Sequence, residues 1–339
     1  MRILVVDDSA LMRKFISDML NSEAEMTVVG TARDGLEALE QIEKLHPDVV
    51  TLDVTMPRMD GLTALKHIMN EHPLPVIMLS SFTREGAETT LNALEYGAFD
   101  YVLKPSGAIS LDIHSVKEAL IGKIKAAKNA KFPKRPLPVT APTTELTGEF
   151  SKKAILIGAS TGGPPAIEQI LVNLPAKIPA TLIVQHMPPG FTQFFADRLS
   201  TMCKFAVKEA KQGDAVEKNR VLIAPGGYHM TVDTDERVHL NQNPTEHGVR
   251  PAVDPLMKTA AEVYTSETLG VLLTGMGRDG ALGMQAIKQA GGFTIAQDEA
   301  TSAIFGMPKA AIDLQCVDRV LPLQQIPNEL VRVSQKKIS

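Results

Sequence analysis

The sequence predicts two α/β domains, each built around a mainly parallel β-sheet. Three observations support this prediction. The chain has 339 residues, more than one ordinary hydrophobic core organises. Short apolar runs alternate with amphipathic stretches in both halves, and a segment with four prolines and no apolar period separates them. We therefore expect a first domain at residues 1–122, a basic and proline-rich linker at 123–151, and a second domain at 152–339.

Five short apolar runs divide the first domain. We expect strands at residues 3–6, 26–30, 48–52, 75–79 and 100–103. Helices are expected to begin near Ser9, Gly35, Gly61, Arg84 and Ile113. Right-handed crossovers between parallel strands then bring the loops after the strands to one edge of the sheet.

The strand rhythm resumes in the second domain. We expect strands at residues 154–158, 180–185, 221–225, 269–274 and 293–296, with helices between them. Residues 228–240 resemble a β-hairpin with Asp233 and Asp235 in its turn. The second domain is therefore predicted to combine a mostly parallel sheet with one hairpin.

Composition and charge exclude several classes of protein. Hydrophobic residues make up 44% and charged residues 22%, which is typical of soluble domains. The apolar run at residues 3–6 is short and meets Asp7 at once, so we expect neither a signal peptide nor membrane insertion, and a cytoplasmic location. Cys203 and Cys316 lack CxxC spacing and are expected to be buried, reduced thiols.

The charge is distributed unevenly along the chain. Residues 1–122 carry 10 Lys and Arg against 19 Asp and Glu, whereas residues 152–339 carry 19 against 18. Neither domain offers the basic stripe that nucleic acid requires, so no nucleic-acid partner is expected.

Five polar residues follow the strands of the first domain: Asp7, Asp8, Asp53, Ser80 and Lys104. Parallel strands bring these residues to a single crevice. Neighbouring carboxylates repel unless a cation neutralises them, and an all-oxygen cluster suits Mg²⁺. We expect Asp53 to attack a phosphoryl donor and Lys104 to balance the charge of the phosphate.

The segments VVDDS, LDVTMPRMDG, MLSS and YVLKP resemble, in order and spacing, those of two-component receiver domains. The resemblance covers residues 1–122. It implies a flavodoxin-like five-stranded doubly wound sheet and phosphorylation of Asp53 by a chemotaxis histidine kinase. It also implies that Mg²⁺ is held by Asp7, Asp8, Asp53 and the backbone of Thr55, and that the phosphate is sensed by Ser80, Tyr101 and Lys104.

The second domain carries a glycine-rich turn between a predicted strand and a predicted helix. Residues 158–162 fit the G-x-S-x-G pattern, which lifts Ser160 to a helix N-terminus, although similar turns also bind phosphates. His186 and Asp279 follow other strands and are expected at the same crevice. Together these three residues form a nucleophile, a base and an orienting acid. Their chain order differs from that of α/β-hydrolases.

Five segments of the second domain are similar to those of chemotaxis protein-glutamate methylesterases, the CheB family: GASTGG, QHMPPGF, RPAVD, TGMGRDG and FGMP. The resemblance implies that Ser160, His186 and Asp279 are catalytic, that Thr161 assists, and that the Met276 amide contributes to an oxyanion hole. It implies phosphorylation-activated hydrolysis of glutamate methyl esters, and deamidation of glutamines, on methyl-accepting chemoreceptors. No cofactor is expected for the hydrolysis itself.

Several residues carry a second interpretation. Asp279 is also placed to cap the helix that begins near Gly280. Arg250 and Asp254 are suited either to a structural pair or to the lining of a substrate cleft. Three further histidines lack metal-ligand spacing and are interpreted as surface or packing residues: His229, His239 and His247.

Two rival functions remain open from the residues alone. One is a response regulator whose second domain binds a nucleotide or a protein, although GASTGG does not match G-x-G-x-x-G and no Walker lysine follows. The other is a serine esterase for small metabolites under receiver control. Labelling of Ser160 by a fluorophosphonate separates the esterases from the binding module.

Overall fold

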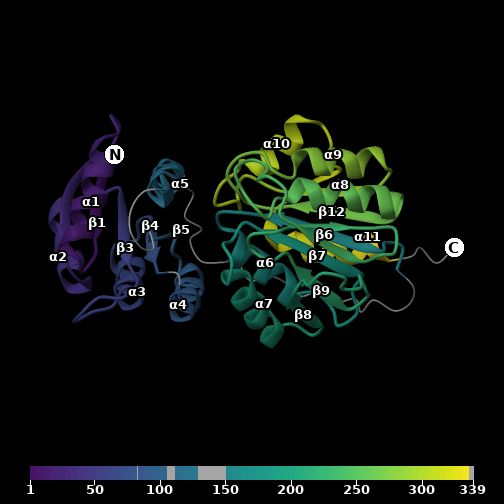
Figure 1. Cartoon of the computed structure of the whole chain (residues 1–339), viewed down its shortest axis with the longest axis horizontal. Helices are drawn as coiled ribbons and strands as arrows, with labels where there is room; N and C mark the ends of the chain where they lie inside the picture. Colours follow the sequence, from purple (N-terminus) through teal and green to yellow (C-terminus); the bar gives the residue numbers. More distant parts are fainter. Residues whose placement is uncertain (82, 105–110, 129–149, 336–339) are drawn as a thin grey trace. The chain divides into compact units, whose positions relative to one another are not determined.

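The computed structural model describes residues 1–81, 83–104, 111–128 and 150–335, except for the side chains of 111–115. The chain divides into two compact units, Met1–Phe132 and Pro133–Ser339 (Figure 1). Each unit is an α/β fold around its own sheet, so the predicted fold class is confirmed.

The first unit is a five-stranded parallel sheet in the order β2-β1-β3-β4-β5. Its elements are β1 Arg2–Val6, α1 Ala10–Asn21, β2 Thr27–Ala32, α2 Gly35–Leu45, β3 Val49–Asp53, α3 Gly61–Glu71, β4 Val76–Ser80, α4 Arg84–Glu95, β5 Asp100–Leu103 and α5 Leu111–Ala127. Strands β3 and β4 are buried along their whole length, as is usual for a parallel sheet covered on both faces.

Side-chain caps set the start of four helices in this unit. The side chains of Ser9, Asp34, Asp60 and Thr83 each accept a backbone N–H from the first turn of α1, α2, α3 and α4. Each helix therefore begins at a defined residue close to the carboxyl edge of the sheet.

The last helix of the first unit extends further than expected. The linker was predicted from residue 123, but α5 runs to Ala127, because Ile124 and Ala127 bury an apolar face within the lysine-rich segment. Lys123 donates to the carbonyl of Tyr101 at 2.7 Å and lies 2.9 Å from the Asp100 carboxylate. Residues 129–149 of the predicted linker lie outside the described residues.

The second unit has a seven-stranded parallel sheet in the order β14-β13-β12-β6-β7-β9-β8, and the predicted hairpin forms as β10-β11. Its elements are β6 Ala154–Ala159, α6 Gly163–Val172, β7 Ala180–Gln185, α7 Phe191–Met202, β8 Ala206–Glu209, β9 Arg220–Ile223, β10 His229–Val232, β11 Val238–Asn241, α8 Val253–Tyr264, η1 Thr265–Glu267, β12 Thr268–Leu272, α9 Ala281–Gln289, β13 Phe293–Gln297, α10 Met307–Asp313, β14 Arg319–Leu321, η2 Leu323–Gln325 and α11 Ile326–Ser334.

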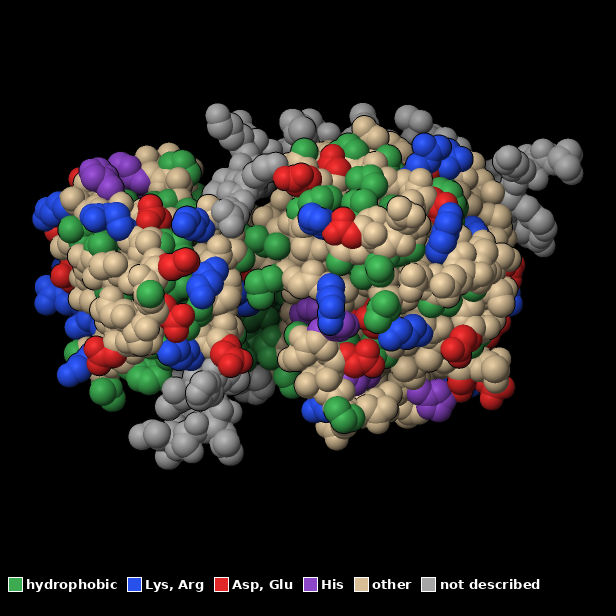
Figure 2. All heavy atoms as spheres, turned by 90° about the horizontal axis from the view of Figure 1, so that it is seen from above, with side chains coloured by type: hydrophobic (Ala, Val, Ile, Leu, Met, Phe, Trp, Pro, Cys, Tyr) green, Lys and Arg blue, Asp and Glu red, His purple; other side chains and the backbone are tan. Residues whose placement is uncertain are grey.

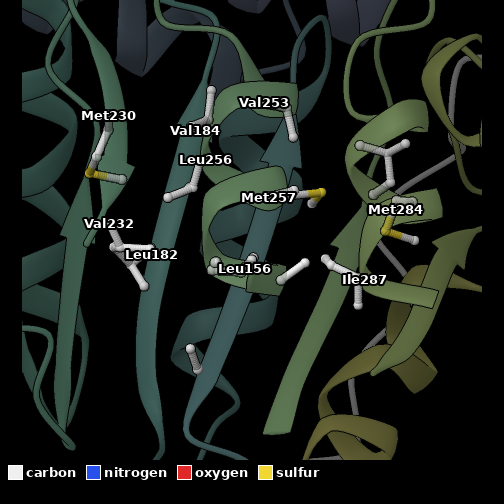
Figure 3. Close-up of a cluster of buried hydrophobic side chains, with 14 of the residues drawn as sticks. Leu156, Leu182, Val184, Met230, Val232, Val253, Leu256, Met257, Met284 and Ile287 are labelled. Carbon is white, nitrogen blue, oxygen red and sulfur yellow. The ribbon is translucent and has the colours of Figure 1, made fainter. Parts of the chain in front are cut away.

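Helices cover both faces of this sheet. Helices α8, α9 and α10 lie on one face, and α6, α7 and α11 lie on the other (Figure 1). The core of the first face joins Leu156 and Leu182 of neighbouring strands to Leu256 and Met257 of α8 and Met284 of α9 (Figure 3). This packing holds α8 and α9 against the strands whose ends carry the predicted site.

The surface is mixed in charge. Lysine, arginine and acidic side chains are interspersed on the face shown in Figure 2. In the parts of the chain that the structure describes, no helix has the length and apolar character needed to cross a membrane. Both cysteines are free thiols, Cys316 buried and Cys203 half-buried.

Candidate active site and phosphoacceptor site

Ser160 lies at the carboxyl end of β6, three residues before α6 begins. Its backbone N–H donates to the carbonyl of Thr274 at 3.0 Å, and its carbonyl accepts from Gln185 Nε2 at 2.9 Å. Gly162 caps α6 in the left-handed conformation, with a φ of 75° that glycine adopts readily. The ends of three strands thereby hold the turn that carries Ser160 in place.

The base and the acid of the predicted triad meet at this edge. His186 follows β7, and its backbone N–H donates to the Ala159 carbonyl at 3.1 Å. Its Nε2 lies 2.8 Å from Oδ2 of Asp279, whose side chain is almost fully buried. Nδ1 is therefore the ring nitrogen left for Ser160. Between the described side chains of Ser160 and His186 no hydrogen bond forms, and catalytic contacts of this kind often tighten only when substrate binds.

The Asp279 carboxylate accepts the free backbone N–H groups at the start of α8, and it does not cap α9. Its carboxylate accepts from the backbone N–H groups of Val253 at 2.6 Å and Asp254 at 3.0 Å, the first residues of α8. It also accepts from Gly280 N at 2.8 Å, which lies before α9, so the predicted cap of the helix near Gly280 is corrected. The amino end of a helix attracts negative charge, which stabilises the Asp279 carboxylate at the start of α8.

Burial by itself raises the pKa of Asp279. The hydrogen bond and charge of His186 and the two N–H groups of α8 outweigh burial, so the pKa lies below its ordinary value. The acid therefore stays ionised and able to orient the imidazole.

Gly275 brings a backbone turn directly against the nucleophile. A Cβ atom on Gly275 would lie 2.8 Å from the Cβ of Ser160 and closer still to Sδ of Met307. The next residue, Met276, is half-exposed, and its backbone N–H donates to none of the described residues. Thr161 is buried beside Ser160, and its carbonyl accepts from the Thr274 hydroxyl at 2.9 Å.

The acidic cluster of the first unit assembles as predicted from the strand ends. Lys104 Nζ lies 2.7 Å from Oδ2 of Asp7 and 2.8 Å from Oδ2 of Asp53, and both carboxylates are buried. Asp8 is exposed, and one carboxylate oxygen from each of the three acids falls within 4.8 Å of the others. This all-oxygen donor set, with two buried acids, fits Mg²⁺.

Burial raises the pKa of Asp53, and the Asp7 charge adds to this rise. Lys104 and the Thr55 backbone oppose it without cancelling it. Helix α3 approaches this strand closely, because a Cβ on Gly61 would clash with the Asp53 carbonyl oxygen, and Gly61 N donates to Val54 O at 3.0 Å. The Asp53 carboxylate is thus held between a strand end and a helix start.

Ser80 and Tyr101, which with Lys104 were predicted to sense the phosphate, both face inward. The Ser80 hydroxyl is buried, accepts from Thr90 Oγ1 at 2.8 Å and donates to the Gly86 carbonyl at 3.2 Å, both in α4. The Tyr101 side chain is buried under Lys123, and burial raises the pKa of its hydroxyl well above the ordinary value.

Two of the three histidines interpreted as surface or packing residues fit that interpretation, and the third, His247, has contacts that it did not include. His229 is buried, and its Nδ1 accepts from Ala252 N at 3.2 Å, whereas His239 pairs with Asp233 in the exposed hairpin. His247 Nε2 lies 2.9 Å from Oδ2 of Asp254, beside the predicted triad, which its sequence context did not indicate.

The suggested pair of Arg250 and Asp254 does not form. Arg250 Nη1 instead donates to the carbonyls of Gln242 and Asn243, at 2.9 and 2.8 Å, and Asp254 faces His247. The cause is the start of α8, which turns the Asp254 side chain toward α9.

Comparison with known families identifies both units. A family model described as CheB methylesterase matches residues 155–330, which is more than half of the chain. The chain belongs to the CheB methylesterase family. A response regulator receiver domain model matches residues 3–114, so this member carries a receiver domain ahead of its hydrolase domain.

Relatives of the family match over nearly the whole chain. A protein-glutamate methylesterase/protein-glutamine glutaminase of Pyrococcus abyssi is 52% identical, over 98% of this chain and 93% of its own. One of Symbiobacterium thermophilum with the same name is 47% identical, over 98% and 96%. The crystal structure of the Thermotoga maritima CheB methylesterase catalytic domain is 42% identical, covers 54% of this chain and 98% of its own, and has a TM-score of 0.52.

Proposed function

We propose that this protein is a phosphorylation-activated hydrolase of glutamate methyl esters on methyl-accepting chemoreceptors. It releases glutamate and methanol, and from receptor glutamines it releases ammonia. The observation that carries the proposal is the contact of His186 with buried, ionised Asp279 beside Ser160. The names of the full-length relatives supply the substrate class. A cytoplasmic location follows if the receptors present these glutamates to the cytoplasm.

The reaction begins with attack of Ser160 Oγ on the ester carbonyl, while Nδ1 of His186 accepts the hydroxyl proton. Asp279 orients the ring through Nε2 and stabilises the imidazolium that forms. The proton then passes to the departing methoxide, which leaves as methanol. Water, activated by His186, hydrolyses the acyl-Ser160 intermediate.

The unengaged N–H of Met276 is our proposed oxyanion donor. Gly275 places this backbone against Ser160 without a side chain between them. Hydrogen bonds to the developing oxyanion commonly give about 10²–10³-fold in kcat. Thr161 assists through its fixed position after the nucleophile.

Phosphorylation of Asp53 by a chemotaxis histidine kinase is the proposed control. Asp7, Asp8, Asp53 and the Thr55 backbone would hold Mg²⁺, which neutralises charge on the transferring phosphoryl group. Lys104 already lies between Asp7 and Asp53 and is placed to pair with the added phosphate. Ser80 would leave Thr90 and Gly86 for the phosphate, and a coupled shift of Tyr101 would bias the unit toward its active state.

Methanol release from methylated chemoreceptor in membranes tests the proposal, with Mg²⁺ and a small phosphodonor present or absent. We expect Ser160→Ala to abolish release, and Asp53→Ala to remove only the response to the phosphodonor. Ser200→Ala, an exposed serine on α7, is the matched control and should behave as the unaltered protein. If no methanol is released but a fluorophosphonate still labels Ser160, the hydrolase stands and the receptor substrate is refuted.

A further inference from the structure

A second imidazole lies beside the predicted catalytic acid. His247 Nε2 is 2.9 Å from Oδ2 of Asp254 and 3.9 Å from Oδ1 of Asp279. On the opposite side of Asp279, His186 contacts Oδ2 at 2.8 Å. Two carboxylates and two imidazoles thus form one continuous group, in which the sequence analysis gave a catalytic role only to His186 and Asp279.

The two carboxylates are bound to the amino ends of two helices. Asp279 accepts from the first two N–H groups of α8, while Asp254, within that first turn, accepts through Oδ1 from Gly283 N of α9 at 2.7 Å. Asp254 is completely buried and Asp279 is 2% exposed. Two buried anions that both lie within 4 Å of His247 Nε2 repel each other unless a cation offsets one of them.

The described residues supply no lysine or arginine within 4 Å of either carboxylate, and a third acid, Glu246, has a carboxylate oxygen within 4.8 Å of ligand atoms of His247 and Asp254. Arg250 is engaged with the carbonyls of Gln242 and Asn243, and Lys258 lies 4.0 Å from Glu246. Imidazoles are therefore the available counter-charges. Because His186 has to lose its proton to act as a base, the remaining counter-charge is His247.

The turn that carries His247 also points to a dedicated role. Val249 N donates to Glu246 O at 3.0 Å, and His247 and Gly248 have φ values of 54° and 78°. Such a turn favours Asn or Gly, because a left-handed backbone disfavours larger side chains. Histidine at this position is not explained by the turn, but it places an imidazole between Asp254 and Asp279.

We propose that His247 is a positioning residue for the esterase reaction: in its protonated form it offsets the charge of Asp254, so that His186 interacts with less negative charge than Asp254 and Asp279 together would present. The proposal rests on the proposed role of Ser160, His186 and Asp279 as the triad. Without His247, the second carboxylate favours the protonated, inactive form of His186.

The pH dependence of Ser160 labelling by a fluorophosphonate tests this role. The probe needs no receptor, so its outcome is independent of the proposed substrate. His247→Gln should move the midpoint of the acidic limb upward by about 0.5–1 pH unit, the size expected of one nearby charge, because uncompensated carboxylates hold a proton on His186. Within that limb the labelling rate should fall by about 3- to 10-fold.

Removing the paired acid should reverse the shift. Asp254→Asn alone should move the midpoint downward, and His247→Gln combined with Asp254→Asn should bring it back toward that of the unaltered protein. His239→Gln is the matched control, since His239 forms a similar 2.6 Å pair with Asp233 in the hairpin. It should leave the profile unchanged.

An unshifted acidic limb in His247→Gln, with or without a lower melting temperature, would overturn the proposal and leave His247 a structural residue. If His247→Gln does not fold, Asp254→Asn decides the question: a downward shift supports the proposal, and an unchanged or raised midpoint refutes it.

Discussion

Gly275→Ala is the sharpest test of the geometry around the nucleophile. The new Cβ would lie 2.8 Å from the Cβ of Ser160 and would clash with Sδ of Met307. Met307 is fully buried but flexible, whereas Ser160 cannot retreat without moving the turn held by Thr274 and Gln185. Overpacking of this kind costs about 1–3 kcal/mol of stability. A displaced nucleophile or oxyanion donor costs about 10²-fold or more in kcat.

Two assays separate these effects. Urea denaturation measures the free energy of unfolding, and methanol release measures catalysis. Gly275→Ala with Met307→Ala should be less destabilised than the sum of the single changes, because the new methyl fills vacated space. Activity should stay low, since the contact with Ser160 remains. Gly213→Ala, at a φ of 81° with no atom within 4 Å of its Cβ, is the control for stability loss without loss of activity. A Gly275→Ala variant with unaltered kcat would refute the reasoning.

Three further changes probe the two sites. Gly61→Ala should block labelling by a small phosphodonor and lower the melting temperature of the first unit, because its Cβ meets the Asp53 carbonyl. Asp53→Asn should raise that melting temperature at pH 7. Burial raises the pKa of Asp53, so its charged form weakens the fold, and the advantage of the variant should shrink as pH falls toward about 4. Mg²⁺ should stabilise the unaltered protein but not Asp53→Asn. Asp279→Asn should lower kcat by about 10⁴-fold, measured as methanol release, because the amide favours the wrong tautomer of His186; a loss below tenfold would contradict the triad.

The fold was largely predictable because the apolar strand runs and the turn residues between them indicate the same element boundaries. Strands β3 and β4 are mostly apolar and show no alternation of polar residues, since both of their faces are buried. Strands β8 and β14 were missed, because they are edge strands of four and three residues with mostly exposed or half-buried side chains. A short edge strand leaves little apolar pattern to detect.

The candidate site was predictable wherever a residue directly follows a strand. Ser160 and His186 follow β6 and β7, and Asp53 ends β3 in the other unit. Parallel topology alone brings such residues to the carboxyl edge of their own sheet. His247 and Asp254 were not predictable in the same way. The contact between them depends on the left-handed turn at His247 and on the residue at which α8 begins. Neither feature produces a periodic pattern in the sequence. Their pairing becomes visible only through distances across the tertiary structure.

The chain order of the predicted triad follows from the order of the strands. Strand β6 has β7 on one side and β12 on the other, so the direction of winding changes at the strand that carries Ser160. The helices that follow β6 and β12 lie on opposite faces, which opens the sheet edge at this strand. His186 then arrives from β7 and Asp279 from the loop after β12, flanking the nucleophile. In a sheet with this reversal the base can precede the acid along the chain. Catalysis depends on where the two side chains lie at the switch point, and not on their order in the sequence.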